Sequence, residues 1–144
     1  MTGRRWRAGG SVFSAVVLLA GGVLTAAAAT ARSADTTTRF PAARTVVVDN
    51  RNGPITVRAG GPGITVHRRL AWTLAEPWLQ ENRDDTTLTL HATCGRPDHT
   101  VQIIIDCEIA YDLEVPPETA LDLSATGPIS VTGVRGDLRV RPGR

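Results

Sequence analysis

Four carboxylates in one stretch of the chain have a spacing that could support chemistry. Asp106, Glu108, Asp112 and Glu114 all occupy even positions between residues 101 and 115, so on a β-strand they would share one face. Same-face neighbours on a strand lie ~6.6 Å apart, which would allow pairs to hold calcium or to act in glycoside hydrolysis. An acidic outer face also keeps a long strand soluble, and we favour this simpler interpretation.

Cys94 and Cys107 are the two cysteines of the chain. In an oxidising compartment an even count predicts a disulfide, which would close a loop of about 14 residues and contribute ~3 kcal/mol through chain entropy. A metal site is the alternative, because His91 and His99 lie nearby in the sequence, but this spacing fits no familiar zinc pattern. We therefore predict a Cys94–Cys107 disulfide and no metal ligand.

The other candidate residues form no catalytic motif. After residue 31 the chain has three serines, none in a G-x-S-x-G turn, and it has neither a P-loop nor a dinucleotide-binding glycine pattern. The histidines are scattered and are interpreted as surface residues. Trp78, in an expected loop, is the best aromatic candidate for contact with a glycan or a partner. We predict that the protein is not an enzyme and uses no cofactor.

The first 34 residues are predicted to direct the chain out of the cytoplasm. Three arginines precede residues 11–31, an uncharged segment that is long enough to cross a membrane as one hydrophobic helix and that ends in an A-x-A triplet. It is either a cleaved signal peptide or a retained anchor with its N-terminus inside and its C-terminus outside. Residues 35–44 are then a polar linker, and residues 45–144 form the folded domain, secreted or anchored.

Charge does not indicate a nucleic-acid partner. The chain has a formal net charge of +2, but three of its 16 basic residues lie in the N-terminal segment. The 13 arginines that remain oppose 14 carboxylates, so the exported part is close to neutral. We expect no nucleic acid, and contact with the membrane only through a retained N-terminal segment.

A fourteen-residue pattern occurs twice in the folded domain, as GPITVRAGGPGITV and GPISVTGVRGDLRV. Nine-residue steps between short β-branched strands, with glycine-rich corners, predict a winding chain of the β-solenoid or β-helix type. An antiparallel sandwich is the alternative. We expect each copy to be one winding with its aliphatic side chains stacked inward. The positions concerned are Gly53, Pro54, Ile55, Val57, Ile64 and Val66 in the first copy and Gly127, Pro128, Ile129, Val131, Leu138 and Val140 in the second.

Between the two copies, alternating apolar residues predict further strands over residues 68–74, 86–94 and 101–115. Residues 80–85 are polar and are predicted to be a loop. No helical periodicity occurs after residue 31, so the predicted class is all-β, preceded by one N-terminal hydrophobic helix.

The segments G-P-I-T-V and G-P-I-S-V-x-G, followed by G-D-L-R-V, resemble the repeats of the bacterial "putative adhesin" family of unknown function. The resemblance covers about residues 45–140, and it implies a β-solenoid-like envelope domain without catalytic residues, often behind a membrane segment. Members of that family tend to continue beyond the point at which this sequence stops, at Arg144. We expect the resulting sheet edge either to be shielded by Arg139, Arg141 and Pro142 or to self-associate.

These observations together predict an extracytoplasmic envelope module that binds a polymer or a protein, in the manner of an adhesin. One alternative is an envelope-stress sensor or regulator, which requires that the anchor be kept. The other is a polysaccharide-active β-helix enzyme, which requires the four carboxylates to converge in a groove with Trp78.

Overall fold

The protein is described by a computed structural model that covers residues 31–96, 98 and 106–143. Ten strands and no helix occur in this part of the chain, so the all-β class is confirmed. The strands are β1 (Arg32–Phe40), β2 (Thr45–Asn50), β3 (Ile55–Ala59), β4 (Ile64–Trp72), β5 (Pro77–Arg83), β6 (Thr87–Cys94), β7 (Glu108–Val115), β8 (Ala120–Ala125), β9 (Ile129–Thr132) and β10 (Leu138–Pro142). The predicted N-terminal helix lies outside the described residues, and a search of the described ones finds no helix able to span a membrane.

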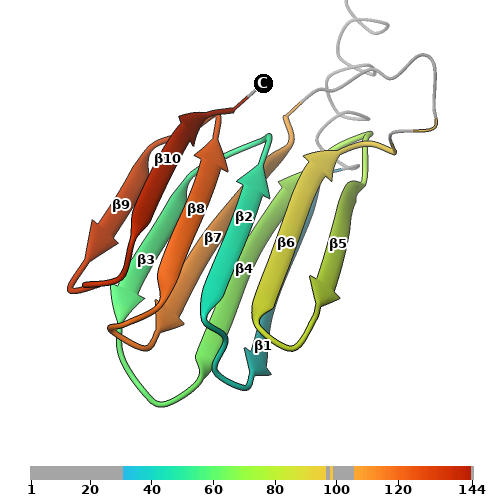
Figure 1. Ribbon diagram of the computed structural model, residues 1–144. Coiled ribbons are helices and arrows are strands. Elements are labelled where there is room, and N and C mark those ends of the chain that lie inside the picture. Colours follow the sequence, from blue (N-terminus) through green and yellow to red (C-terminus); the bar gives the residue numbers. More distant parts are fainter. Residues whose placement is uncertain (1–30, 97, 99–105, 144) are drawn as a thin grey trace, which may run out of the picture. The chain divides into compact units, whose positions relative to one another are not determined.

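The strands form two five-stranded sheets that pack face to face (Figure 1). Sheet A has the order β1-β4-β7-β3-β9, and sheet B has the order β10-β8-β2-β6-β5. From β6 to β10 the chain alternates between the sheets, and β2, β6, β8 and β10 run parallel to one another. Strands β1, β4 and β5 pair in the antiparallel direction. Both sheets are therefore mixed, with parallel strands on one side and antiparallel strands on the other, and a β-solenoid repeat is not shown.

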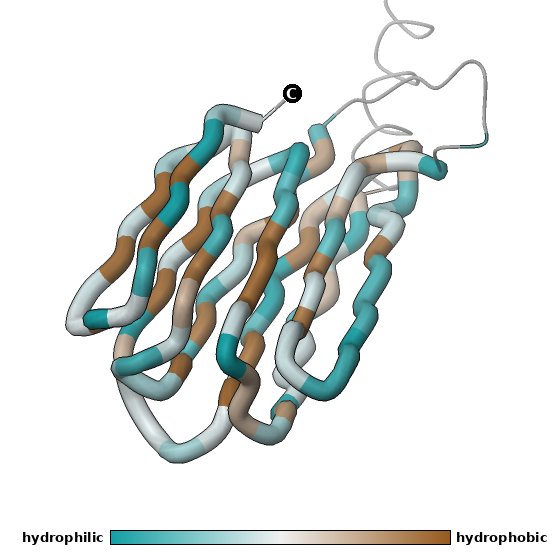
Figure 2. The backbone as a smooth tube through the Cα atoms, in the orientation of Figure 1, coloured by the Kyte–Doolittle hydropathy of each residue, from teal (hydrophilic) through white to brown (hydrophobic). Residues whose placement is uncertain are grey.

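The core lies between the sheets and follows the alternation of the sequence. In β6 the residues Leu88, Leu90 and Ala92 are fully buried, whereas Thr89 and His91 between them are partly exposed. The odd-numbered residues of β7 face the same layer from sheet A, and Tyr111 is the largest of them. Apolar and polar segments alternate along most strands in Figure 2. The inward faces predicted for residues 86–94 and 101–115 are thus confirmed for the described residues.

The first halves of the two repeat copies lie side by side as neighbouring strands of sheet A. Strands β3 and β9 pair in parallel, with Ile55 opposite Ile129 and Val57 opposite Val131. The corners that lead into them also stack, because the N–H of Gly127 donates to the carbonyl oxygen of Gly53 at 3.2 Å. A Cβ on Gly127 would lie 2.6 Å from the carbonyl carbon of Gly53, so the close approach of the two corners requires glycine there.

The second halves of the copies diverge, which corrects the prediction of two equivalent windings. Ile64 and Val66 lie in β4, which stays in sheet A, whereas Leu138 and Val140 lie in β10, which belongs to sheet B. After β9 the chain is drawn across to sheet B by backbone hydrogen bonds from Arg135 and Gly136 to the carbonyl of Pro117. The glycine-rich turn after β3 instead returns the chain antiparallel within sheet A.

Two further expectations are wrong. Most of the predicted linker, residues 35–44, is part of β1, and most of the predicted loop, residues 80–85, is part of β5. Both strands lie at sheet edges, so each has a neighbouring strand on one side only. Because both of their faces are partly exposed to solvent, neither strand needs an alternating apolar pattern. The predicted strand over residues 101–115 is confirmed for Glu108–Val115, and residues 101–105 lie outside the described part.

Candidate functional site

The four predicted carboxylates do not meet Trp78. Glu108, Asp112 and Glu114 are on the outward-facing positions of β7 in sheet A, and Asp106 lies in a bend before that strand. Asp112 pairs with Arg58 of the adjacent strand at 3.2 Å. Trp78 is on β5 of sheet B. Trp78 and the carboxylates of β7 therefore belong to different sheets. Among the described residues, no group of three or more potential ligand side chains could hold a metal ion.

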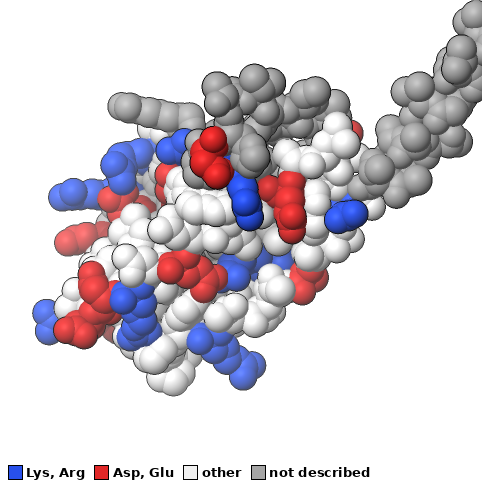
Figure 3. Space-filling view, turned by 90° about the vertical axis from the view of Figure 1, so that its right-hand side faces the viewer, with Lys and Arg blue, Asp and Glu red and all other residues white. Residues whose placement is uncertain are grey.

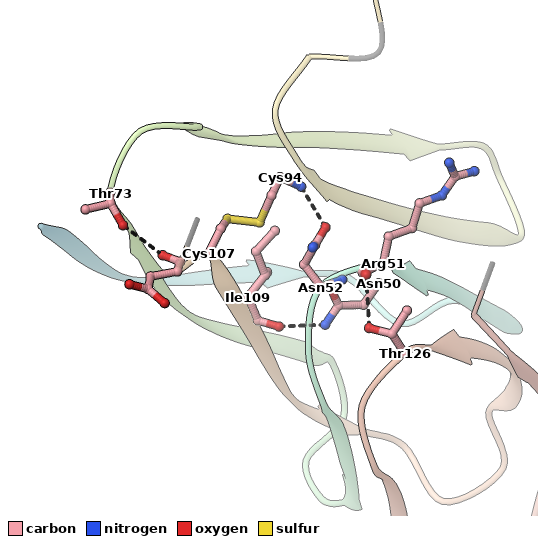
Figure 4. Close-up of a disulfide and its surroundings, with 9 residues drawn as sticks. Asn50, Arg51, Asn52, Thr73, Cys94, Cys107, Ile109 and Thr126 are labelled. Carbon is pink, nitrogen blue, oxygen red and sulfur yellow. Dashed lines mark hydrogen bonds between the residues drawn. A yellow bond between two sulfur atoms is a disulfide. The ribbon is translucent and has the colours of Figure 1, made fainter. Parts of the chain in front are cut away.

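Cys94 and Cys107 form a disulfide, as predicted, with their Cα atoms 6.2 Å apart. The bond joins the end of β6 in sheet B to the residue that precedes β7 in sheet A, and it therefore links the two sheets (Figure 4). His91 was the candidate for the alternative metal site. Its Nδ1 instead lies 3.0 Å from Asp49 Oδ2. His99 lies outside the described residues.

A buried asparagine organises the corner beside the disulfide. The side-chain amide of Asn50 is fully buried and donates to the carbonyl oxygens of Ile109, at 2.6 Å, and Pro54, at 3.2 Å. Its Oδ1 accepts from the N–H of Asn52, whose own Oδ1 accepts from the N–H of Cys94 at 2.8 Å. Figure 4 shows these side chains between the two sheets. The corner is therefore structural, since its polar atoms are used to hold strands together.

The outer face of sheet B carries a shallow hollow of about 670 Å³. Its lining comes from four adjacent strands and includes Asp49, Arg51, His91, Ser124 and Arg141. Four polar residues occupy matching register positions across the sheet, and Gln80 on β5 extends the row to the edge strand. The row reads Gln80, His91, Asp49, Ser124 and Arg141. Strand pairing thus assembles one polar stripe from five separate segments.

Ion pairs hold most of the charged groups of the hollow in place. Asp49 accepts from His91, and the guanidinium of Arg51 lies 3.7 Å from the same carboxylate. Arg141 makes a bidentate contact with Asp122, in which Nε lies 3.1 Å from Oδ1 and Nη2 lies 2.9 Å from Oδ2. Bidentate guanidinium–carboxylate pairs fix orientation as well as charge. The stripe therefore offers hydrogen-bonding groups whose positions are already defined.

Trp78 borders this stripe. Its ring meets the imidazole of His91 edge-on, with centroids 5.8 Å apart and planes at 73°. Leu79, the next residue, packs against the core, which leaves Trp78 on the outward side of β5. Trp78, the predicted contact residue, therefore lies next to the polar stripe. It was predicted to be in a loop, but it is a partly buried residue of strand β5.

Ser124, Asp49 and His91 are the residue types of a hydrolase triad, but their order across the sheet rules out that function. Asp49 is on the middle strand, between His91 on one side and Ser124 on the other. Serine and histidine are thus two strand spacings apart, ~9.6 Å, whereas a general base must lie within hydrogen-bond distance of its nucleophile. Within this row, Ser124 therefore has no histidine next to it that could act as its general base.

Sequence reasoning missed most of this stripe. Asp49, Asp122 and Arg141 each occupy an outward position of a strand, where a charged residue is ordinary. His91 was interpreted as an isolated surface residue, but it lies within β6 and pairs with Asp49, 42 residues away. Only the register between parallel strands brings these residues together, and alternation within one strand carries no signal for it.

No protein-family model and no curated protein match the sequence. Two solved structures are similar in fold: a "putative cell adhesion protein" from Clostridium sporogenes, with 10% identity and a TM-score of 0.50, and a "putative adhesin" from Parabacteroides merdae, with 9% identity and a TM-score of 0.54. Each alignment covers 77% of this chain, which spans 57% and 44% of those two chains. The chain therefore shares the fold of bacterial proteins described as adhesins, in agreement with the resemblance of its repeats.

Proposed function

We propose that this protein is a non-catalytic, extracytoplasmic binding module of the cell envelope with an adhesin-like role. The observation that carries the proposal is the preorganised polar stripe beside Trp78 on the outer face of sheet B. The two packed sheets, between which β6 to β10 alternate, would provide the rigid platform for this surface. The fold shared with proteins described as adhesins and the disulfide, typical of oxidising compartments, support the same conclusion.

The ligand class that best fits this surface is an envelope polysaccharide. Sugar rings have apolar faces that pack on indole, and hydroxyl groups that bond to carboxylates, imidazole and guanidinium. Trp78 supplies the first kind of contact, and Asp49 and Arg51 supply the second. The hollow is open and crosses several strands, which suits a polymer better than a small enclosed ligand.

Co-sedimentation of the exported protein with insoluble polysaccharides tests this function. The probes are purified peptidoglycan sacculi, chitin and cellulose. We expect binding to at least one polymer, and a loss of about tenfold in affinity or more for Trp78→Ala and Arg51→Ala. Arg58→Ala is the matched control, because Arg58 forms a similar exposed ion pair on sheet A. The absence of binding to all three polymers, or an equal loss with Arg58→Ala, would contradict the proposal.

The two alternatives make different predictions. A polysaccharide-active enzyme would release sugar products during the same incubation, and we expect none, because the carboxylates of β7 and Trp78 are on different sheets. An envelope-stress sensor would need its N-terminal segment in the membrane. Mass spectrometry of the exported protein gives the mature N-terminus and thereby separates an anchored protein from a secreted one.

A further inference from the structure

The outer face of sheet A carries a second hollow, of about 580 Å³. Its lining comes from β1, β4 and β7 and from the corner before β3. Because Leu70 packs against the core, its neighbours Arg69 and Ala71 on β4 point outward. Ala110 and Glu108 of β7 are the register partners of these two residues, so they point outward as well. The four outward residues form one block on two adjacent strands.

Small apolar residues form the floor of this hollow. Ala71 and Ala110 occupy one diagonal of the block, and Pro54 lies beside them, since its carbonyl oxygen accepts from the N–H of Tyr111 at 3.1 Å. Ala110 is only 8% exposed although it points outward, so the longer side chains around it screen it from solvent. An apolar floor with a few polar groups above it is typical of small-molecule sites.

Opposite charges occupy the other diagonal of the block. The Cα atoms of Arg69 and Glu108 lie ~7–8 Å apart by the geometry of antiparallel strands. Within the part of the chain that the structure describes, neither side chain forms an ion pair or a side-chain hydrogen bond, whereas Arg58 on the same face pairs with Asp112. The hollow therefore offers an unpaired cation and an unpaired anion above an apolar floor.

A second carboxylate borders the cation. Asp35 of β1 is opposite Arg69 in register, and its Oδ1 lies 3.1 Å from Nε2 of His67. The second oxygen of this carboxylate can still accept a hydrogen bond from a ligand. The hollow thus presents one guanidinium and two carboxylates, so a complementary ligand carries one carboxylate and two cationic groups.

Charges of both signs also mix on the surface around the edge strands. Figure 3, which looks onto the side where β5 lies, shows acidic and basic side chains interspersed. A polyanion or a polycation would meet like charges on such a surface, whereas a ligand that carries both signs would not.

We infer that this hollow binds a free amino acid with a basic side chain, for which lysine is the model. The α-carboxylate of lysine accepts from the guanidinium of Arg69, and its two ammonium groups donate to Glu108 and Asp35. Its aliphatic carbons lie on the alanine floor. A free amino acid is short enough to bridge charges this close, whereas a polymer would extend beyond the hollow. The site is separate from the proposed polysaccharide surface, which is on sheet B.

An NMR titration of the exported protein with L-lysine tests the inference. We expect saturable shifts of the amide signals of Arg69–Ala71 and Glu108–Ala110, with a dissociation constant on the order of 1 mM, because the charged groups are exposed. Sodium acetate and butylamine carry one charge each and are the fragment controls. They should not reach saturation over the same range of concentrations.

Three variants remove separate parts of the site. Arg69→Ala and Glu108→Gln should each raise the dissociation constant for lysine about tenfold or more, since each removes a charge-assisted contact. Ala71→Leu fills the floor without a change in charge and should weaken binding by a similar factor. Arg39→Ala is the matched control, because Arg39 is an exposed arginine of β1 on the same face but outside the hollow.

The absence of saturable shifts with lysine, an equal affinity for acetate or butylamine, or an equal loss in Arg39→Ala overturns the inference. The outcome is independent of polysaccharide binding. Trp78→Ala alters sheet B alone and should leave the dissociation constant for lysine unchanged. A loss of lysine binding in this variant would place the site on the other sheet and would also overturn the inference.

Discussion

The side-chain amide of Asn50 on sheet B donates a hydrogen bond to the carbonyl oxygen of Ile109 on sheet A, with nitrogen and oxygen 2.6 Å apart. This contact joins residues that are 59 positions apart in the chain, and the amide is fully buried. The residues paired with Asn50 on the two neighbouring strands are Ala92 and Ala125. Neither has a polar side chain that could replace the amide. The corner between β2 and β3 therefore depends on this one residue.

Asn50→Ala is expected to lower the free energy of unfolding by about 2 kcal/mol, because it removes the buried side-chain donor to the carbonyl oxygen of Ile109 and one of the two donors to that of Pro54. Urea denaturation followed by tryptophan fluorescence measures the change. Asn82→Ala, at an exposed position of β5, is the control and should change stability by less than about 0.5 kcal/mol. Equal effects of the two substitutions would show that the buried amide is not important.

Removal of the disulfide is expected to cost about 3 kcal/mol, because Cys94 and Cys107 are 13 positions apart and the bond restricts the unfolded chain. Thermal unfolding of the native protein with and without a reductant measures this loss. The double variant Cys94→Ala/Cys107→Ala should unfold at the lower temperature in both conditions. A native protein that is insensitive to reductant while the double variant is destabilised would assign the loss to packing.

Gly127→Ala is expected to destabilise the fold by about 2 kcal/mol or more, because the new methyl group would press on the backbone of the Gly53–Pro54 corner. Gly61→Ala is the matched control, since its methyl group would meet only the carboxylate of Glu114, at an ordinary distance of 3.5 Å. Chemical denaturation of both variants is the measurement. A tolerated Gly127→Ala would mean that the two corners are not stacked in solution.

Glu81→Ala is expected to lower the free energy of unfolding by about 2 kcal/mol, because it removes the carboxylate that pairs with the guanidinium of the buried Arg68. Since Glu81 is partly exposed, this loss is smaller than for a fully buried ion pair. Glu118→Ala removes an ion pair whose two side chains are each 75% exposed, and it should change stability by less than about 0.5 kcal/mol. Denaturation at low and high salt compares the two pairs, and only the Glu118 pair should respond to salt.

Tyr111 offers a pH-dependent test, because it is the one tyrosine of the chain. Burial raises its pKa from 10 to about 12, against the opposing effect of the positive charge on Arg68. The unfolded chain therefore loses this proton first, and the contribution of Tyr111 to stability is complete below pH 10 and lost as the pH rises towards 12. Phenolate absorbance should titrate near 12 in the folded protein and near 10 in denaturant. The Tyr111→Phe variant should show neither the titration nor this part of the pH dependence.

The sequence alone determined the all-β class, the inward faces of the central strands and the cysteine pair. A strand with neighbours on both sides and one buried face must alternate, so the periods of β6 and β7 could be read directly from the residues. The disulfide followed because the chain has two cysteines and an export signal is expected. The edge strands β1 and β5 were missed, because a strand with one neighbour and two partly wet faces shows no such period.

Only the tertiary structure decided which strands are neighbours, and this governs the proposed binding surface. The stripe of Asp49, His91 and Arg141 exists because distant segments pair in one register, and periodicity within a segment cannot specify a partner. The same limit explains the repeat. Val66 and Val140 occupy equivalent positions in similar sequences, yet Val66 is fully buried in β4 and Val140 is half exposed on an edge strand. Burial depends on the strands that cover a residue, and these come from elsewhere in the chain.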